Sequence, residues 1–386
     1  MNSTEHGGGA PIRKKIRAQV KLISQGAYGC VYRPSIQCNG RPGKTKNFVS
    51  KLQLKSTADN EIAIGAKLTK IPNFNFHFAP IIRSCPVQLA KLDQNTMLNS
   101  CNVVKKDSTR EQEFVLNRIR FVGTDTLETY INNRIHRGYL ILKFFELHQF
   151  LLRSVTHMVE QSVVHFDLKE NNIIYDAKNH VPIIIDFGMS VDMTFLSGNQ
   201  LELYDSGFHI YYEKYPPWCL DIVICSFLVQ KSVHSTTPHA WAKQTVDIDQ
   251  LLKIVDLYYS GNDIIRTLSK LGPTAIAAIK QSHNKWNNFV RTQCAGKNGK
   301  EVVDMIASSG WKTWDNFGMA VIFITMWIRY DLAKMVSSPE LYQQLMVTLI
   351  TSLPNERPTA DITNNELAKI TKLLTKNNYT PTPAAI

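Results

Sequence analysis

The chain has 386 residues, of which 44% are apolar and 20% are charged, so it can bury a sizeable core. It carries 44 Lys and Arg against 32 Asp and Glu, and the net charge of +12 favours anionic partners such as nucleotides, acidic protein segments, nucleic acid or anionic lipid. The longest apolar stretch, Met319–Ile328, is about half the length of a bilayer span, which excludes a transmembrane helix there and predicts a buried one.

The cysteines give an expectation about the compartment. None of the seven belongs to a C-x-x-C pair or to a zinc-ligand spacing. An odd, scattered set of this kind indicates reduced thiols in an intracellular protein. Residues 1–24 also lack the apolar run of a secretory signal. We therefore expect a cytoplasmic protein without a membrane span.

The first third of the chain is rich in strand patterns. Residues 1–19 are Gly-rich and then basic, and they predict a flexible tail. A helix is expected at Ser56–Ile71, where Ser-Thr-Ala-Asp resembles a capping box. Alternating and β-branched patterns predict four strands, at Val20–Ser24, Cys30–Arg33, Asn47–Leu54 and Glu113–Phe121.

Helical patterns dominate from Leu127 onward, beginning with apolar residues at helical spacing over Tyr139–Gln161. A strand-rich first part followed by a helical remainder predicts an α+β fold with two unequal lobes. No internal repeat is visible in the sequence.

The stretch VVHFDLKENNIIYDAKNHVPIIIDFGMS, residues 163–190, carries the chemistry. Asp167 lies in a turn after an apolar pair and is a candidate base, with the cation of Lys169 beside it. Asn172 follows five residues after Asp167, and a buried strand ends just before Asp186. These two side chains offer the oxygen ligands that magnesium takes when it also holds phosphates. A base, a cation and two metal ligands are the parts needed for phosphoryl transfer.

The stretch resembles the protein kinase family, whose catalytic loop reads H-R-D-L-K-x-x-N and whose metal-binding strand ends in D-F-G. The resemblance implies a bilobal kinase-like fold with ATP and Mg²⁺ as cofactors. It implies Asp167 as catalytic base, Lys169 on the transferred phosphate, and Asn172 and Asp186 on magnesium. Lys169 resembles the loop of the Ser/Thr-specific kinases, so the implied substrates are Ser and Thr hydroxyls of proteins.

ISQGAYGCVY, residues 23–32, resembles the glycine-rich loop G-x-G-x-x-G-x-V of the family, with Ser24 in place of the first glycine. The resemblance implies that Gly26 and Gly29 let the backbone approach the phosphates, that Tyr28 caps them and that Val31 covers the adenine. Without the catalytic loop downstream, Gly-Ala-Tyr-Gly would indicate only a hairpin turn.

Phe48-Val49-Ser50-Lys51 resembles the V-A-I-K strand of kinases, which implies Lys51 as the phosphate-binding lysine. Glu61 is then its expected partner, although the interval between the two is shorter than usual for the family. RFVGTDTLETYI resembles a hinge followed by a helix, so the adenine is expected near Arg120–Gly123, against the backbone of Arg120 and Val122.

Two further segments resemble the second lobe of kinases. WDNFGMAVIFITMW resembles the helix that begins D-x-W-S-x-G, which implies that Asp315 anchors the catalytic loop; Asp221, before DIVICSFLV, is the alternative. LPNERPTADI resembles the P-x-x-R-P-T-A element and makes Arg357 a buried structural arginine. Its usual partner is the Glu of an A-P-E motif, which is absent here, leaving Glu213 and Asp221 as candidates.

The predicted organisation is an N-lobe at 20–124, a C-lobe at 125–375 and a flexible tail at 376–386. The resemblance covers roughly 20–218 and 311–375, and the C-lobe contains a helical insertion at about 222–310 without a clear counterpart. Phe166, the missing A-P-E and the insertion resemble kinases encoded by large DNA viruses, for which the location would be a host cell or a virion.

Two other function classes compete with an active Ser/Thr kinase. A pseudokinase scaffold is disfavoured because Lys51, Asp167, Asn172 and Asp186 are all present. A small-molecule or lipid phosphotransferase is disfavoured by Lys169 and by the Arg-Pro-Thr-Ala element. Nucleic acid is a permitted partner but not a required one, because the basic charge does not explain the motifs.

Overall fold

The computed structural model describes residues 20–26, 29–38, 41, 43, 46–89, 92, 100–106, 113–196, 198–230 and 237–376. The predicted tails at 1–19 and beyond 376 lie outside this range. The described residues form a mixed α+β structure of two compact units. Unit 1 comprises the chain up to Ala58 together with Arg83–Phe121, and unit 2 comprises Asp59–Ile82 and the chain from Val122 onward. Each predicted lobe is continuous in sequence. In the structure, the segment Asp59–Ile82, which lies within the predicted N-lobe, belongs to unit 2.

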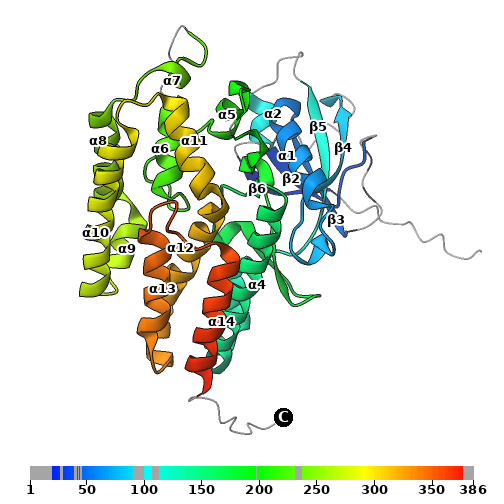
Figure 1. Cartoon of the computed structure of the whole chain (residues 1–386). Helices are drawn as coiled ribbons and strands as arrows, with labels where there is room; N and C mark the ends of the chain where they lie inside the picture. The colour runs from blue at the N-terminus through cyan, green and yellow to red at the C-terminus, as the bar shows by residue number, and fades with distance from the viewer. Residues whose placement is uncertain are drawn as a thin grey trace, which may run out of the picture. The chain divides into compact units, whose positions relative to one another are not determined.

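Unit 1 is built on a five-stranded sheet with the order β1-β2-β3-β5-β4 (Figure 1). The pairs β1/β2, β2/β3 and β3/β5 are antiparallel. Four of the five strands lie where the sequence predicts them. The strands are β1 (Lys21–Gly26), β2 (Gly29–Arg33), β3 (Phe48–Leu54), β4 (Ile81–Val87) and β5 (Phe114–Arg120).

Strand β4 was not predicted from the sequence. It lies at the edge of the sheet, its residues do not alternate between buried and exposed, and it contains Pro86. Proline lacks the amide hydrogen that a central strand needs, but an edge strand tolerates it. A strand of this composition therefore lacks the pattern by which strands are identified.

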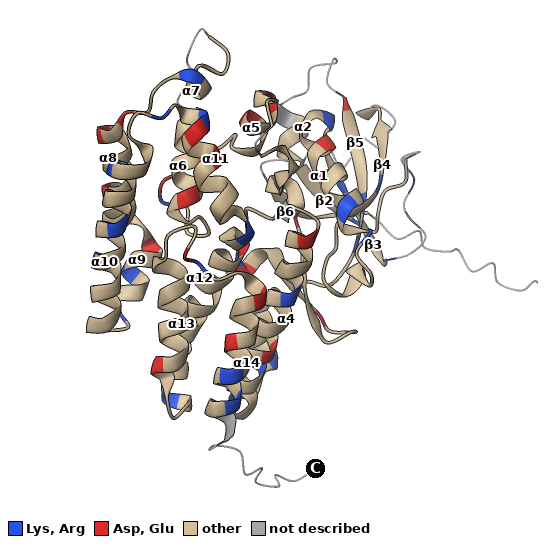
Figure 2. Ribbon diagram, in the orientation of Figure 1, with Lys and Arg blue, Asp and Glu red and all other residues tan. Residues whose placement is uncertain are grey.

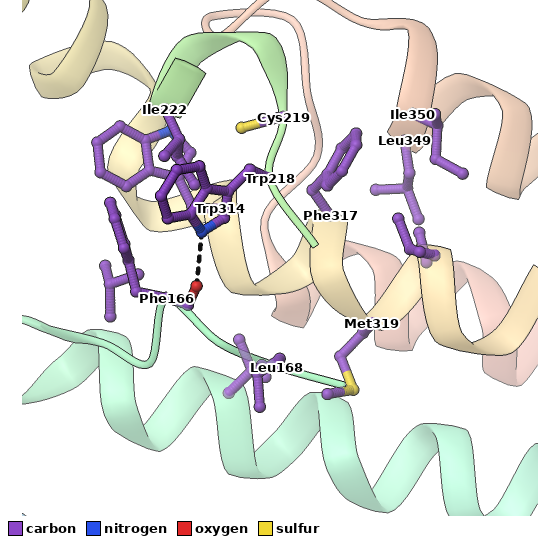
Figure 3. Packing of buried hydrophobic residues seen from close by; sticks show 14 of the residues in the cluster. Phe166, Leu168, Trp218, Cys219, Ile222, Trp314, Phe317, Met319, Leu349 and Ile350 are labelled. Atoms are coloured by element: carbon purple, nitrogen blue, oxygen red, sulfur yellow. Dashed lines mark hydrogen bonds between the residues drawn. The ribbon is translucent and has the colours of Figure 1, made fainter. Parts of the chain in front are cut away.

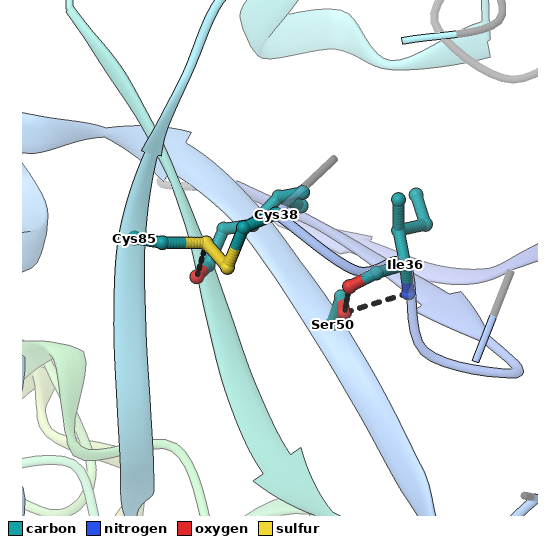
Figure 4. The surroundings of a disulfide bond; sticks show 5 residues. Ile36, Cys38, Ser50 and Cys85 are labelled. Atoms are coloured by element: carbon teal, nitrogen blue, oxygen red, sulfur yellow. Dashed lines mark hydrogen bonds between the residues drawn. A yellow bond between two sulfur atoms is a disulfide. The ribbon is translucent and has the colours of Figure 1, made fainter. Parts of the chain in front are cut away.

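Two disulfides cross-link unit 1, so the prediction of reduced thiols is wrong for four of the cysteines. Cys30 in β2 is bonded to Cys101, and Cys38 is bonded to Cys85 in β4 (Figure 4). The partners are 71 and 47 residues apart in sequence, yet their Cα atoms are 5.8 and 6.0 Å apart. Sequence spacing cannot show this proximity, because the sheet creates it. The three remaining cysteines are buried free thiols, at 219, 225 and 294.

Helix α1 (Lys55–Leu68) follows β3 directly, close to the predicted range of Ser56–Ile71. The division between the two units falls within this helix, after Ala58. A short helix, α2 (Asn102–Lys106), belongs to unit 1 and lies next to β2.

Unit 2 is predominantly helical, and its longest helix, α4 (Leu140–Glu160), matches the prediction at Tyr139–Gln161. Two small antiparallel ladders follow it: β6 (Val163–Val164) with β9 (Val191–Asp192), and β7 (Ile173–Asp176) with β8 (Val181–Ile184). The other helices are α3 (Leu127–Arg134), α5 (Leu201–Gly207), α6 (Leu220–Gln230), α7 (Ala240–Lys243), α8 (Ile248–Gly261), α9 (Asp263–Ser269), α10 (Pro273–Phe289), α11 (Gly299–Gly310), α12 (Trp314–Arg329), α13 (Pro339–Thr351) and α14 (Ala360–Lys376).

Helix α12 forms the centre of unit 2. It packs against α4, α9 and α13, and α14 in turn packs along α4. Only the two ends of α12 carry a charge, at Asp315 and Arg329, and thirteen of its sixteen residues are buried. Helix α14, in contrast, contains several charged residues (Figure 2). The predicted buried helix at Met319–Ile328 is thus confirmed. No helix among the described residues combines the length and apolar character required to cross a membrane.

The region predicted as an insertion, 222–310, is helical and belongs to the same core. Helix α11 packs on α6, and α10 packs on α8, α9 and α13. Leu251, Trp286 and Val302 from this region lie in the same hydrophobic cluster as α4 and α12. These helices therefore contribute to the core of unit 2.

Candidate active site

The loop that follows β6 is anchored by the first turn of α12. The carboxylate of Asp315 accepts hydrogen bonds from the backbone N–H groups of His165 (2.7 Å) and Phe166 (3.2 Å). Burial raises the pKa of Asp315, while the charge of His165 and the two N–H donors act against that rise. The expectation that Asp315, rather than Asp221, anchors this loop is confirmed.

Phe166 turns the loop by adopting a left-handed backbone conformation, with φ of 69°. The residue is 4% exposed, and its ring contacts those of Trp218 and Trp314, with centroids 5.3 and 5.8 Å away (Figure 3). The ring of Phe208 lies 6.1 Å away. The indole Nε1 of Trp218 donates to the carbonyl oxygen of Phe166 at 2.8 Å. A positive φ is energetically costly for a bulky residue, so it persists only where the surrounding structure stabilises it. The aromatic cluster and the hydrogen bonds provide this stabilisation.

Asp167, the next residue, has a nearly buried carboxylate whose two oxygens have different partners. Oδ2 accepts from Lys169 Nζ and from Asn172 Nδ2, both at 2.9 Å. Oδ1 accepts from the hydroxyl of Tyr215. The structure thus brings together the predicted base, the predicted cation and one predicted metal ligand around one carboxylate. Tyr215 is a fourth member that sequence reasoning missed.

Lys169 and Asn172 are oriented for different partners. The Lys169 side chain is 43% exposed, against 9% for Asp167, so it lies at the open side of the loop. Burial acts to lower the pKa of Lys169, but the hydrogen bond and the charge of Asp167 outweigh it, and the net pKa is raised. Asn172 also donates to the backbone oxygen of Asp167 at 2.8 Å, so its amide oxygen is the atom suited to a cation.

The strand that leads to Asp186 is bonded to the same loop. The N–H of Ile185 donates to the carbonyl oxygen of Asn172 at 2.9 Å, and the carbonyl oxygen of Ile185 lies 3.0 Å from His165 Nε2. Asp186 itself has a left-handed backbone, with φ of 63°, and Phe187 after it is buried. The two predicted metal ligands, Asn172 and Asp186, therefore stand on hydrogen-bonded neighbouring segments.

The chemistry of this donor set fits a magnesium ion that also holds phosphates. Among the described residues, no group of three or more His, Cys, Asp or Glu side chains could hold a metal by itself. Magnesium usually takes only one or two protein ligands and completes its shell with water and phosphate oxygens. One carboxylate, at Asp186, and one amide oxygen, at Asn172, agree with that mode of binding.

The predicted glycine-rich loop forms the β1–β2 hairpin of unit 1. Gly26 is paired with Gly29, and Ser24 is paired with Val31 next to a register shift between Leu22 and Ser24. A Cβ atom at Gly29 would lie 2.7 Å from the carbonyl oxygen of Leu52, so only glycine fits there, whereas Gly26 has open space around it. Tyr28 lies outside the described residues. The roles of the hairpin residues toward phosphates and adenine stay predictions.

Lys51 lies on the central strand of the sheet of unit 1, opposite Val31 on β2 and Asn117 on β5, and the residue is 8% exposed. Glu61 lies in the part of α1 that belongs to unit 2 and is also buried. The pairing of Lys51 with Glu61 therefore stays a prediction.

The predicted hinge crosses the boundary between the units. Arg120 is the last residue of β5, and Val122 is the first residue of unit 2. Between them, the N–H of Phe121 donates to the carbonyl oxygen of Asn47 at 2.9 Å. The amide of Phe121 is thus already hydrogen-bonded within unit 1. Adenine recognition by the backbone of Arg120 and Val122 stays a prediction.

The partner of Arg357 is Asp221, one of the two candidates. The guanidinium donates to both carboxylate oxygens, at 2.9 and 3.0 Å, and both side chains are essentially inaccessible to solvent. Trp314 Nε1 also donates to Asp221, at 3.1 Å. Burial acts to lower the pKa of Arg357, but the carboxylate of Asp221 more than offsets this and raises it. Glu213 makes no such ion pair with Arg357.

A cavity of about 400 Å³ opens beside Lys169 in unit 2. Its apolar wall consists of Leu168, Pro216, Pro217, Val321 and Ile322, and Tyr215 and Lys169 line the side next to Asp167. The acidic rim carries Glu128 and Glu170, which both accept hydrogen bonds from Arg329 at 2.8 and 2.9 Å. Three consecutive residues, Tyr215, Pro216 and Pro217, thus line the cavity next to the candidate base.

No family model matches this chain, and no curated protein matches its sequence. The functional assignment depends, as a result, on the residues and the geometry described above.

Proposed function

We propose that this protein is an ATP-dependent protein kinase that transfers the γ-phosphoryl group of ATP to Ser and Thr hydroxyls of protein substrates. The observation that carries the proposal is the arrangement around Asp167. One carboxylate is held by Lys169 and Asn172, on a loop anchored by Asp315 and hydrogen-bonded to the segment before Asp186. A kinase-like fold is part of the same proposal, and the α+β division into a sheet-based unit and a helical unit supports it.

In this mechanism Asp167 accepts the proton of the substrate hydroxyl as that oxygen attacks the γ-phosphorus. Lys169 lies beside Asp167 and is partly exposed, so its ammonium group can neutralise charge on the transferred phosphoryl group. Asn172 and Asp186 would hold Mg²⁺, which when bound neutralises phosphate charge and orients ATP. Lys51, on β3 of unit 1, is proposed to bind the phosphates. The cavity beside Lys169 offers room for the chain of a protein substrate next to its acceptor residue.

The location proposed with this function is intracellular, in the cytoplasm or, for a viral enzyme, in the host cell or virion. The two disulfides of unit 1 bear on this point, because disulfides are rare in the reducing cytosol. An oxidising stage of the protein's life would reconcile the proposed location with the disulfides.

Asp167→Asn tests the proposal. This change keeps the size of the side chain but removes the base, so ATP binding should persist while phosphate transfer falls by about 10²–10⁴-fold or more. Asp186→Asn should instead raise the apparent magnesium requirement as well as slow turnover, because it removes a ligand carboxylate. Initial rates with a generic protein substrate, at several magnesium concentrations, separate the two. Wild-type activity in Asp167→Asn would refute the proposed function.

The identity of the phosphorylated residue tests the substrate class. Phosphoamino-acid analysis of the labelled protein should give phosphoserine and phosphothreonine. Labelling of a small molecule or lipid, with none in protein, would favour a phosphotransferase of that class instead.

A further inference from the structure

The hydroxyl of Tyr215 occupies the one oxygen of Asp167 that the catalytic loop leaves open. Lys169 and Asn172 both donate to Oδ2, and Tyr215 donates to Oδ1. The carboxylate side chain is only 9% exposed. The phenol thus fills one of the acceptor positions of Oδ1, the oxygen that a substrate hydroxyl would approach.

Other contacts hold Tyr215 in this position. Lys169 Nζ donates to its hydroxyl oxygen at 3.2 Å, and its ring packs edge-to-face on Trp218, with centroids 5.2 Å apart. Trp218 is itself hydrogen-bonded to the catalytic loop at Phe166. Burial, followed by the hydrogen bond to Asp167 and its charge, raises the pKa of Tyr215 to about 12, so the phenol is a proton donor at neutral pH.

We propose that Tyr215 is an internal occupant of the acceptor position, which a protein substrate must displace before it can be phosphorylated. The inference rests on the proposed kinase function and adds a residue that selects the acceptor. A phenol that donates to the base imitates the hydrogen bond of an attacking hydroxyl. Small acceptors such as water gain too little from binding to displace it.

The cavity beside Lys169 shows how a protein substrate would do so. Tyr215, Pro216 and Pro217 together form one wall of this cavity. A substrate segment that binds there would contact Tyr215 itself and the two prolines that follow it. Binding of the substrate chain and release of Asp167 are thus coupled through one short segment of unit 2.

If Tyr215 instead aligned the base, removing its hydroxyl would change the rate of phosphate transfer in the opposite direction. If the bridge from Tyr215 to Asp167 and Lys169 served to align the base, its loss would slow phosphate transfer. The two roles therefore predict opposite effects of removing only the hydroxyl.

The test is Tyr215→Phe, which retains the ring on Trp218, with Tyr212→Phe as a matched control. Tyr212 lies three residues earlier on the same segment and is 52% exposed, and its ring lies 6.2 Å from that of Tyr215. ADP formation without a protein acceptor should rise by about tenfold or more in Tyr215→Phe, since a hydrogen bond to a charged group no longer has to be broken. Phosphorylation of a short unstructured Ser peptide should rise with it, chiefly through kcat, and Tyr212→Phe should resemble the wild type.

Several outcomes would overturn the inference. Unchanged ADP formation in Tyr215→Phe would show that the phenol does not block Asp167, and a lower kcat at unchanged KM would assign it the aligning role. Adding Asp167→Asn to Tyr215→Phe must abolish the gain; a gain that survives would come from another site. If neither the wild type nor Tyr215→Phe forms ADP with any acceptor, the proposed function itself fails. If both enzymes are active at equal rates, only the inference about Tyr215 fails.

Discussion

The candidate catalytic loop of unit 2 and the strands of unit 1 are stabilised in different ways. The loop is held by directional contacts from residues distant in sequence, such as Asp315 and Trp218, and these groups are themselves buried. The sheet of unit 1 is held by backbone ladders between neighbouring strands and by two disulfides. In unit 2 stability depends on satisfying buried polar groups, and in unit 1 it depends in part on covalent cross-links.

The largest effect should come from breaking the buried ion pair of unit 2. Arg357→Met leaves the carboxylate of Asp221 buried without its cation, which should lower the free energy of unfolding by about 3–5 kcal/mol. Chemical denaturation followed by circular dichroism measures the loss, and hydrogen exchange should show faster opening of α6 and α12.

The matched control is the double variant Arg357→Met with Asp221→Leu. Removing both charges abolishes the cost of burying an unpaired one, so this variant should be more stable than the single variant. A double variant that is less stable than Arg357→Met would contradict the idea that the pair is stabilised mainly by charge compensation.

Reduction should affect unit 1 and leave unit 2 nearly unchanged. Loss of the Cys30–Cys101 bond, in the variant Cys30→Ser with Cys101→Ser, should cost about 2–4 kcal/mol, because the unfolded chain regains the freedom that the cross-link removed. Hydrogen exchange with and without dithiothreitol would place the change in β2 and its neighbours.

Cys294→Ser, which changes a buried free thiol, provides the control for this prediction and should respond to dithiothreitol as the wild type does. Alkylation of the denatured, unreduced protein should label three cysteines. Seven labelled cysteines would show that the thiols of unit 1 are reduced in the isolated protein. Disulfides would then not contribute to the stability of unit 1.

The smallest effect is expected from removing phosphate groups. Under the proposed kinase function, Phe166 stands where most regulated kinases have an Arg that pairs with a phosphate on the activation segment. Phe166 cannot donate to phosphate and is buried in an aromatic cluster. Enzyme treated with phosphatase should therefore retain most of its activity, as measured by initial rates on a protein substrate. A fall of tenfold or more, about 1.4 kcal/mol in the barrier, would show that another basic residue has taken over the role of the arginine.

The sequence was most informative where chemistry and order along the chain coincide. Asp167, Lys169 and Asn172 lie within six residues, so a local motif could predict their meeting, and Asp315 could be named from its resemblance to a known helix start. Strands with alternating patterns were predicted well, but the edge strand β4 was not, because its exposure follows no period of two.

The contacts that depend on tertiary folding were beyond the sequence. The disulfides join residues 47 and 71 positions apart, and Tyr215 meets Asp167 across 48 positions. Nothing in the composition of the segment KYPPW, residues 214–218, tells which side chain reaches Asp167. For Arg357 the sequence supplied two acidic candidates, and only packing distinguishes Asp221 from Glu213.

The pairing of Arg357 with an aspartate at the start of α6 also has an evolutionary consequence. A buried guanidinium requires a negative charge at a given point in space, but it does not require that charge to come from a given place in the chain. Among diverging relatives the arginine should therefore persist while the acid migrates between nearby segments. A motif defined by the spacing of the acid would be lost in such a lineage long before the architecture changes, so its distant members should be sought by the spatial environment of the arginine.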